Sequence, residues 1–171
     1  LRQAENLYGL GYDVFMPDYR SYGKSGGQID SEEQLFSDAQ QAYDWLKKYF
    51  REDQIILLGY SLGSSMATYL AKENKPQHLV LVSPFRSMVA MKNLILPVAP
   101  SFLMKYPFYN DRHLLEADCP ISLFHGTDDE LIPFAHSEYL QALLPAQAQL
   151  TPLSGTGHRG AIFSKQIRTA L

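Results

Sequence analysis

A serine lies in the motif Gly-Tyr-Ser-Leu-Gly at residues 59–63, directly after the apolar run IILL at 55–58. The apolar run predicts a buried strand, and the residues after the motif predict a helix, so we expect Ser61 on a sharp strand-to-helix turn. Glycines at 59 and 63 would relieve crowding there, and the Leu62 N–H would face a developing oxyanion. Ser61 is therefore a candidate nucleophile. The alternative is a polar residue at an ordinary strand-to-helix corner.

A serine hydroxyl is a poor nucleophile unless a base accepts its proton and a carboxylate orients that base. Among the five histidines we favour His158, which lies in the glycine-rich loop SGTGHRG between the last expected strand and the last helix. Such a loop can project an imidazole toward the sheet edge, and the alternative is a surface histidine. His78 and His113 are set aside because both precede any plausible acid in the chain, and in such sites the order is Ser, acid, His. We expect His125 to support its loop and His136 to be a solvated residue of a helix.

The orienting acid is expected in the segment HGTDDELIP at 125–133, because it follows a strand and lies between Ser61 and the candidate base. Asp128, Asp129 and Glu130 compete for this role, and one of them could instead cap the helix near Pro133. Spacing alone does not separate the two aspartates.

Strands that alternate with helices would bring these groups to one sheet edge. This alternation predicts βαβ units and a mostly parallel sheet, and apolar runs without polar alternation predict central strands with helices on both faces. We expect a β-rich run at 12–16, strands at 54–58, 78–82, 121–125 and 147–153, and helices at 1–10, 31–50, 61–73, 134–144 and from 160.

The composition is that of an ordinary globular protein, with 171 residues, 46% hydrophobic residues and a formal net charge of −3. We expect one domain over 1–171, no nucleic-acid partner, and no metal or other cofactor, since metal-ligand and phosphate-loop spacings are absent from the sequence. No apolar run reaches the roughly 18 residues that span a bilayer. The single cysteine, Cys119, fits a reducing compartment, so a cytoplasmic protein is expected, with peripheral membrane association as an addition.

Together these segments resemble the α/β-hydrolase superfamily. LLGYSLGSS, HGTDDELIP and GTGHRG resemble its nucleophile, acid and histidine blocks, and DVFMPDYRSYGKSGG resembles its Asp-x-Arg-Gly-x-Gly-x-Ser loop, with Ser21 where glycine is usual. The resemblance covers essentially the whole chain and is greatest to small α/β-hydrolase domain proteins that act on acyl esters and thioesters. It implies the α/β-hydrolase fold and selects Asp129, the fifth position of His-Gly-x-x-Asp, as the acid, with Asp128 in reserve.

The same resemblance implies strands before Leu1, the last of which would end in a His-Gly loop that supplies the second oxyanion N–H. We therefore expect an N-terminally incomplete domain whose visible oxyanion donor is Leu62.

A cap-like insert is expected at about 84–116. Between Pro84 and Asn110 it is rich in methionine and aromatic residues, and it has three basic residues and no acid. It could form a lid that accepts an acyl chain or faces an anionic membrane, or simply helices packed on the sheet. Tyr60, Met88 and Phe102 are the expected substrate contacts.

The predicted function is that of a serine hydrolase. It would cleave an acyl ester or thioester of a small-molecule or lipid-like substrate, through an acyl-enzyme formed on Ser61. The alternatives are an amidase or peptidase of the same fold and a non-catalytic interaction module.

Overall fold

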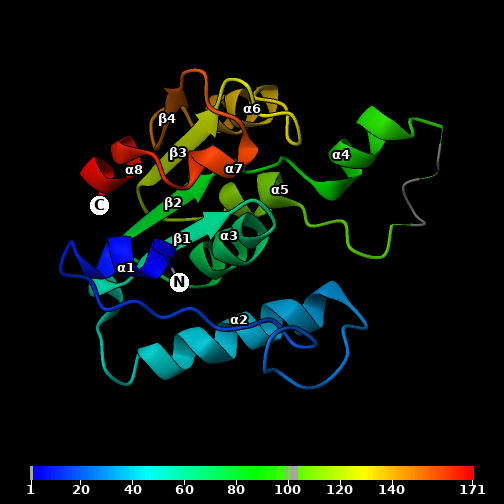
Figure 1. The fold of residues 1–171 in the computed structure, drawn as a ribbon. Coiled ribbons are helices and arrows are strands. Elements are labelled where there is room, and N and C mark those ends of the chain that lie inside the picture. Colours follow the sequence, from blue (N-terminus) through cyan, green and yellow to red (C-terminus); the bar gives the residue numbers. More distant parts are fainter. Residues whose placement is uncertain (1, 99, 101–103) are drawn as a thin grey trace.

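The computed structural model describes residues 2–98, 100 and 104–171. Four strands in these residues form one parallel sheet in the order β1-β2-β3-β4, and the chain crosses from each strand to the next through helices (Figure 1). The carboxyl ends of all four strands therefore meet at one edge of the sheet. The strands are β1 (Ile56–Tyr60), β2 (His78–Val82), β3 (Ile121–Gly126) and β4 (Ala148–Leu153).

Helices cover both faces of the sheet, as the apolar runs predict. Leu79 and Leu81 of β2 pack with α3 and α5, whereas Val80 and Val82 face a second cluster that includes Ala161 and residues of α8. No described helix is both long enough and apolar enough to cross a membrane. The helices are α1 (Arg2–Tyr8), α2 (Glu32–Leu46), η1 (Glu52–Gln54), α3 (Gly63–Glu73), α4 (Met88–Ile95), α5 (Asn110–Leu114), α6 (Ala135–Leu143), α7 (His158–Ala161) and α8 (Lys165–Ala170).

Several predicted boundaries differ from the structure by a few residues, and one β-rich run forms no strand. The first strand begins at Ile56 rather than at residue 54, because residues 52–54 form the short helix η1. Helix α2 ends at Leu46 instead of near residue 50. Residues 12–16 form no strand, and the Phe15 ring stacks on Trp45 of α2 instead. Aromatic packing on a helix thus replaces the pairing that β-propensity indicated.

The segment predicted as an insert leaves the body of the protein as α4 and returns as α5 (Figure 1). Its two ends are joined by backbone hydrogen bonds. The Met88 N–H donates to the Pro107 carbonyl at 2.8 Å, and the Asp111 N–H donates to the Arg86 carbonyl at 3.1 Å. These two bonds therefore join the start of α4 to the segment that leads into α5.

Candidate active site

Ser61 joins β1 to α3 in a left-handed backbone conformation, with φ of +52°. This conformation is uncommon for a residue with a side chain and persists only where its surroundings hold it. The Ser61 N–H donates to the Val82 carbonyl at 3.0 Å, and the Ser64 hydroxyl donates to the Ser61 carbonyl at 2.6 Å. The neighbouring strand and the first turn of α3 therefore hold the strained turn on both sides.

The two glycines of the motif are not equivalent. A Cβ at Gly59 would lie 2.8 Å from the Ala67 Cβ, the Gly63 carbonyl oxygen and the Ser64 Cα, whereas the nearest atom to a Cβ at Gly63, outside its own helix, is the Tyr19 hydroxyl at 3.8 Å. Crowding around the turn thus requires glycine at position 59. The predicted need for glycine at 63 is not supported by a comparable close approach.

Gly59→Ala is therefore expected to lower the free energy of unfolding by about 1–3 kcal/mol, because two of the three blocking atoms belong to the backbone. Urea unfolding followed by circular dichroism measures the change. Gly63→Ala is the matched control and should stay within about 1 kcal/mol of the wild type, since alanine also favours the helix. Equal losses in both variants would contradict the argument.

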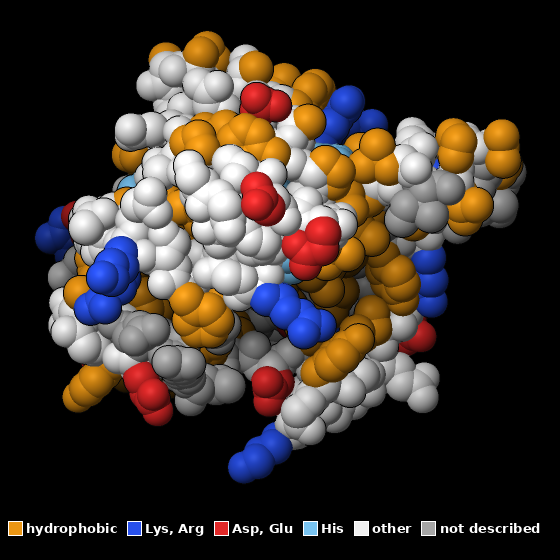
Figure 2. Space-filling model, turned by 45° about the horizontal axis from the view of Figure 1, so that its top comes forward, with side chains coloured by type: hydrophobic (Ala, Val, Ile, Leu, Met, Phe, Trp, Pro, Cys, Tyr) orange, Lys and Arg blue, Asp and Glu red, His pale blue; other side chains and the backbone are white. Residues whose placement is uncertain are grey.

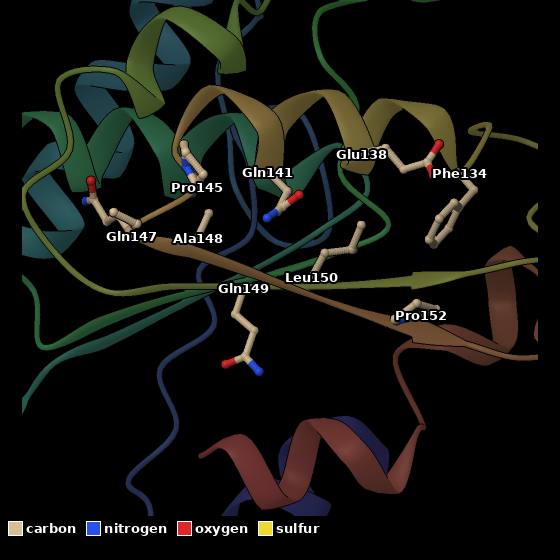
Figure 3. A pocket seen from close by; sticks show the side chains of 10 residues that line it. Phe134, Glu138, Gln141, Pro145, Gln147, Ala148, Gln149, Leu150 and Pro152 are labelled. Atoms are coloured by element: carbon tan, nitrogen blue, oxygen red, sulfur yellow. The ribbon is translucent and has the colours of Figure 1, made fainter.

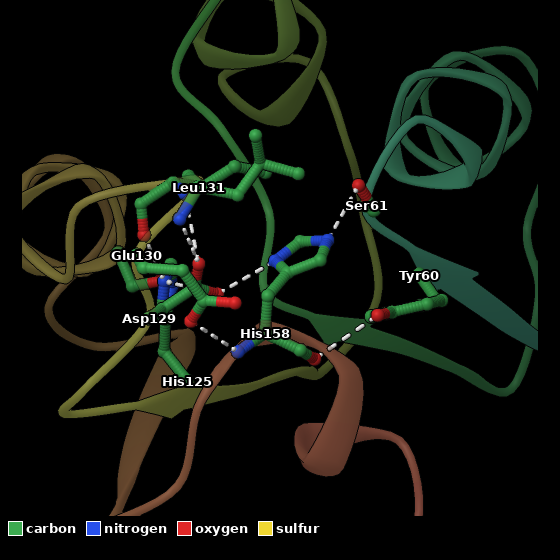
Figure 4. A network of polar contacts seen from close by, with 9 residues as sticks. Tyr60, Ser61, His125, Asp129, Glu130, Leu131 and His158 are labelled. Atoms are coloured by element: carbon green, nitrogen blue, oxygen red, sulfur yellow. Dashed lines mark hydrogen bonds and ion pairs between the residues drawn. The ribbon is translucent and has the colours of Figure 1, made fainter.

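His158, Ser61 and Asp129 meet at the carboxyl edge of the sheet (Figure 4). The His158 Nε2 lies 3.1 Å from the Ser61 Oγ, and its Nδ1 lies 2.8 Å from Asp129 Oδ2. His158 begins α7 and is 6% exposed, and Asp129 is 9% exposed. The structure thus joins the three sequence-predicted residues in one hydrogen-bonded chain.

Asp129 accepts hydrogen bonds on both carboxylate oxygens. While Oδ2 faces His158, Oδ1 accepts the N–H groups of Leu131 (3.0 Å) and Ile132 (2.8 Å). Burial alone would raise the pKa of Asp129, but the Ile132 N–H and His158 together hold that pKa below its ordinary value. The group beside the imidazole is therefore a carboxylate at neutral pH.

The other two candidate acids make different contacts. The Asp128 carboxylate accepts the hydroxyl of Thr127, and the Glu130 carboxylate accepts the backbone N–H of His158 at 3.2 Å. Glu130 therefore holds the main chain of the histidine loop, while Asp129 holds its ring. Asp128 is exposed whereas Asp129 is buried against His158, so the structure distinguishes the two neighbouring aspartates.

His125 and His136 are buried, and each forms a hydrogen bond to the backbone of a loop. The fully buried His125 lies 2.8 Å from the Ile132 carbonyl and 3.3 Å from Asp129 Oδ2, and burial lowers its pKa. His136 is 8% exposed and accepts the Arg86 N–H at 3.1 Å, and burial lowers its pKa too. The expectation of a solvated His136 is wrong, because α6 packs this residue inward.

The expected substrate-contact residues have separate locations. Tyr60 packs against His158, and Met88 begins α4 and packs at the margin of an apolar cluster that includes Phe85. Phe102 lies outside the described residues. Leu62 directly precedes α3, so its N–H belongs to the helix start, and its side chain is 44% exposed.

A buried asparagine, which the sequence did not indicate, connects the insert to the serine turn. Asn110 of α5 is fully buried, and its amide donates to the Ser64 hydroxyl at 3.0 Å and to the Phe85 carbonyl at 2.8 Å. Its carbonyl oxygen accepts the Thr68 hydroxyl at 3.2 Å. Because Ser64 in turn donates to the Ser61 carbonyl, α5 is linked to the serine turn through two consecutive hydrogen bonds.

A hollow of about 690 Å³ lies beside β4, which is at one edge of the sheet, and not at the serine (Figure 3). Glutamine and proline side chains dominate its lining, with Glu138 and Phe134 of the α6 region, and neither Ser61 nor His158 belongs to it. The hollow is therefore separate from the hydrogen-bonded chain.

Cysteine and metal-ligating residues are the other groups that could support hydrolytic chemistry. Burial raises the pKa of the Cys119 thiol to about 11, which keeps it protonated at neutral pH. Among the residues that the structure covers, no group of three or more His, Cys, Asp or Glu side chains is arranged to hold a metal ion. What the site can supply is a serine hydroxyl, a base within reach of its proton, and a carboxylate on that base.

Known proteins resemble the chain in sequence and in fold. The alpha/beta hydrolase fold family matches residues 2–118. The uncharacterized protein Rv2307c of Mycobacterium tuberculosis is 34% identical over 91% of this chain and 56% of its own length, and lysophosphatidylserine lipase ABHD12 of Rattus norvegicus is 31% identical over 75% and 37%. The chain thus spans about half or less of these relatives. An esterase of Pyrococcus furiosus superimposes with a TM-score of 0.77 at 21% identity, covering 99% of this chain and 72% of the esterase.

Proposed function

The chain belongs to the α/β-hydrolase fold family, and on that premise we propose that it is a serine hydrolase that cleaves an acyl ester or thioester. Ser61 is the nucleophile, His158 the general base and Asp129 the carboxylate that orients the base. The observation that carries the proposal is the hydrogen-bonded chain from Ser61 through His158 to Asp129, with distances of 3.1 and 2.8 Å. The first distance lets His158 reach the Ser61 proton, and the second lets Asp129 hold the imidazole by a hydrogen bond.

The mechanism follows from the order of the hydrogen bonds, which run from Ser61 through His158 to Asp129. Ser61 Oγ attacks the acyl carbonyl carbon while His158 Nε2 takes the hydroxyl proton, and Asp129 stabilises the imidazolium that forms. The Leu62 N–H donates to the oxyanion. Collapse of the tetrahedral intermediate breaks the bond to the leaving alkoxide or thiolate, which receives the proton from His158. A water molecule then attacks the acyl-enzyme carbonyl while His158 takes one of its protons. The second tetrahedral intermediate breaks the bond between the acyl carbon and Ser61 Oγ, which takes the proton back from His158, and the acid is released.

A fluorophosphonate probe tests this proposal, because an activated serine displaces its fluoride and becomes covalently phosphonylated. We expect labelling at one residue, identified as Ser61 by mass spectrometry of the digested protein. A series of acyl esters, acyl thioesters and acyl amides of increasing chain length then identifies the leaving group and the acyl length. Absence of both labelling and ester turnover would support the non-catalytic alternative, whereas a preference for amides would support the amidase alternative.

A lipid-like acyl substrate is the class that we propose. Two observations support it: one relative is named a lysophosphatidylserine lipase, and the projecting α4 region carries the exposed apolar side chains Leu94, Leu96 and Val98 (Figure 2). The sequence from Pro84 to Asn110 has basic residues and no acid. Exposed apolar side chains in a segment with basic residues and no acid would suit a phospholipid surface that carries negative charge.

Leu94→Ser is expected to weaken binding to vesicles of phosphatidylcholine and phosphatidylserine by about threefold to tenfold, because a leucine that enters the lipid loses contact with water. Vesicle sedimentation measures the bound fraction. Leu115→Ser is the matched control, since Leu94 is 60% exposed and Leu115 is 59% exposed. Equal effects of the two substitutions, or no binding by the wild type, would contradict the membrane contact and leave the test of Ser61 unaffected.

A further inference from the structure

Tyr60 makes two contacts with His158, although the two residues are 98 positions apart in the sequence. Its hydroxyl donates to the His158 backbone carbonyl at 3.0 Å, and its ring stacks on the imidazole with a centroid distance of 5.2 Å and an interplanar angle of 29° (Figure 4). Tyr60 is the last residue of β1 and directly precedes Ser61. One short segment thus carries the candidate nucleophile and a residue that touches its base.

The other contacts of His158 leave a distinct place for this ring. Asp129 and Ser61 bond to the two ring nitrogens, both of which lie in the plane of the imidazole. Glu130 bonds to the backbone N–H. Tyr60 instead lies against the face of the imidazole. In-plane bonds leave the tilt of the ring less constrained, so a stacked neighbour limits a motion that these bonds do not.

We propose that Tyr60 is a positioning residue of the hydrolytic site, which holds the His158 ring against Ser61 and stabilises its imidazolium form during the reaction. This inference rests on the proposed function. The face of an aromatic ring attracts a cation, and a neutral imidazole gains much less from that attraction than an imidazolium does. Since His158 becomes charged when it takes the Ser61 proton, the stacked ring favours the transition state over the resting state.

The surrounding charges are compatible with this role. Asp129 and Glu130 face His158 from the loop after β3, His125 lies behind Asp129, and Arg159 adjoins the histidine in sequence. None of these groups changes when Tyr60 is replaced, so the comparison of variants isolates the tyrosine. Burial, followed by the charge of Asp129, raises the pKa of Tyr60, which keeps its hydroxyl protonated and able to donate.

Two substitutions separate the two contacts. Tyr60→Phe keeps the ring and removes the hydroxyl, whereas Tyr60→Met replaces the ring with a flexible apolar chain. The measured quantity is the rate constant for fluorophosphonate labelling of Ser61 between pH 4.5 and 9 (about the range in which histidines titrate), because its acid limb reports protonation of the free base. Tyr49→Met, at an exposed position of the surface, is the control for loss of a tyrosine elsewhere.

We expect the midpoint of the acid limb to fall by about 0.4–0.7 pH unit in Tyr60→Met, since loss of the ring face makes the imidazolium less stable. Tyr60→Phe should restore the midpoint and lower the plateau rate by about twofold to tenfold, through loss of the carbonyl hydrogen bond. Tyr49→Met should match the wild type. Thermal unfolding of each variant identifies any that fail to fold.

An unchanged midpoint in folded Tyr60→Met would overturn the inference while leaving Ser61 labelling, and hence the proposed function, intact. A midpoint in Tyr60→Phe that moves as far as in Tyr60→Met would overturn it as well, because the ring is still present. Should Tyr60→Met not fold, Tyr60→Leu replaces it with the same expected shift. A wild-type protein that does not label at Ser61 would remove the proposed function, and this inference with it.

Discussion

Ser61→Ala is expected to lower kcat/KM for acyl-ester hydrolysis by about 10⁶-fold and to abolish fluorophosphonate labelling. The substitution removes the only atom that forms the covalent intermediate, and the base is left without a proton to accept from the enzyme. The remaining acceleration would come from binding and from the oxyanion donor. Hydrolysis of a p-nitrophenyl ester, followed by absorbance, measures the loss.

The structure offers a control for this substitution. Ser154 is exposed and lies in the same loop as His158, so Ser154→Ala changes a nearby serine without touching the hydrogen-bonded chain. Its rate should equal that of the wild type. If Ser61→Ala were labelled at the wild-type rate, another residue would be the one that reacts with the probe. That result would remove Ser61 from the mechanism.

Asp129→Asn is expected to lower kcat/KM by about 10⁴-fold, the loss seen when an amide replaces the carboxylate of such a triad. An amide cannot accept the Nδ1–H of His158 with its nitrogen, so the imidazole can turn to the tautomer that has no lone pair toward Ser61. The same ester assay measures this loss, and a circular dichroism spectrum like that of the wild type at the assay temperature would show that the variant is folded.

The neighbouring aspartate supplies the matched control. Asp128→Asn should change kcat/KM by less than about threefold, because its carboxylate contacts Thr127 and not His158. A larger loss in Asp128→Asn than in Asp129→Asn would exchange their assigned roles.

The stability of the protein is expected to depend on pH through Asp129. The pKa of Asp129 is lowered in the folded protein, so its contribution to stability is fully present above the unfolded value of about 3.9 and disappears as pH falls through the folded value. Urea unfolding at pH values around and below about 4 should show this loss in the wild type. The loss should be smaller in Asp129→Asn, which has no carboxyl group to titrate at that position.

How far the sequence could predict the site depends on the range of the contacts involved. The turn at Ser61 is largely local, since the glycine motif and its flanking apolar residues lie within about ten positions. Residue spacing alone left Asp128 and Asp129 as alternatives, and the resemblance to a family selected Asp129. In the structure the distinction comes from a turn in which Oδ1 of Asp129 accepts two backbone N–H groups, so that Oδ2 points to His158.

Contacts between distant segments could not be predicted in the same way. From the sequence, Tyr60 is interpreted as a packing or pocket residue. Its stack on His158 forms only when the loop after β4 returns to the end of β1, a contact that the sequence does not indicate. Asn110 is 46 residues from Ser64, and an asparagine near a proline and two aromatic residues reads as a turn residue rather than a buried link.

The fold was predictable where hydrophobic runs were unambiguous. The strand His78–Val82 agrees with the prediction at both ends, because a central strand with helices on each face has a continuous apolar sequence. The prediction fails at residues 12–16, which have strand propensity but form no strand, and Phe15 stacks on Trp45 of α2. Propensity describes what a segment can do, and its neighbours decide whether a strand forms.

The hydrogen bonds between Met88 and Pro107 and between Arg86 and Asp111 give the α4 segment a modular character. Because the two ends of this excursion are held together at its base, its length and composition can change while the attachment points stay fixed. Loop-closure entropy adds only about 0.6 kcal/mol for each doubling of loop length. The length of chain between Met88 and Pro107 can therefore differ at little cost in stability, while Asn110, which lies outside that bonded pair, keeps its link to the serine turn.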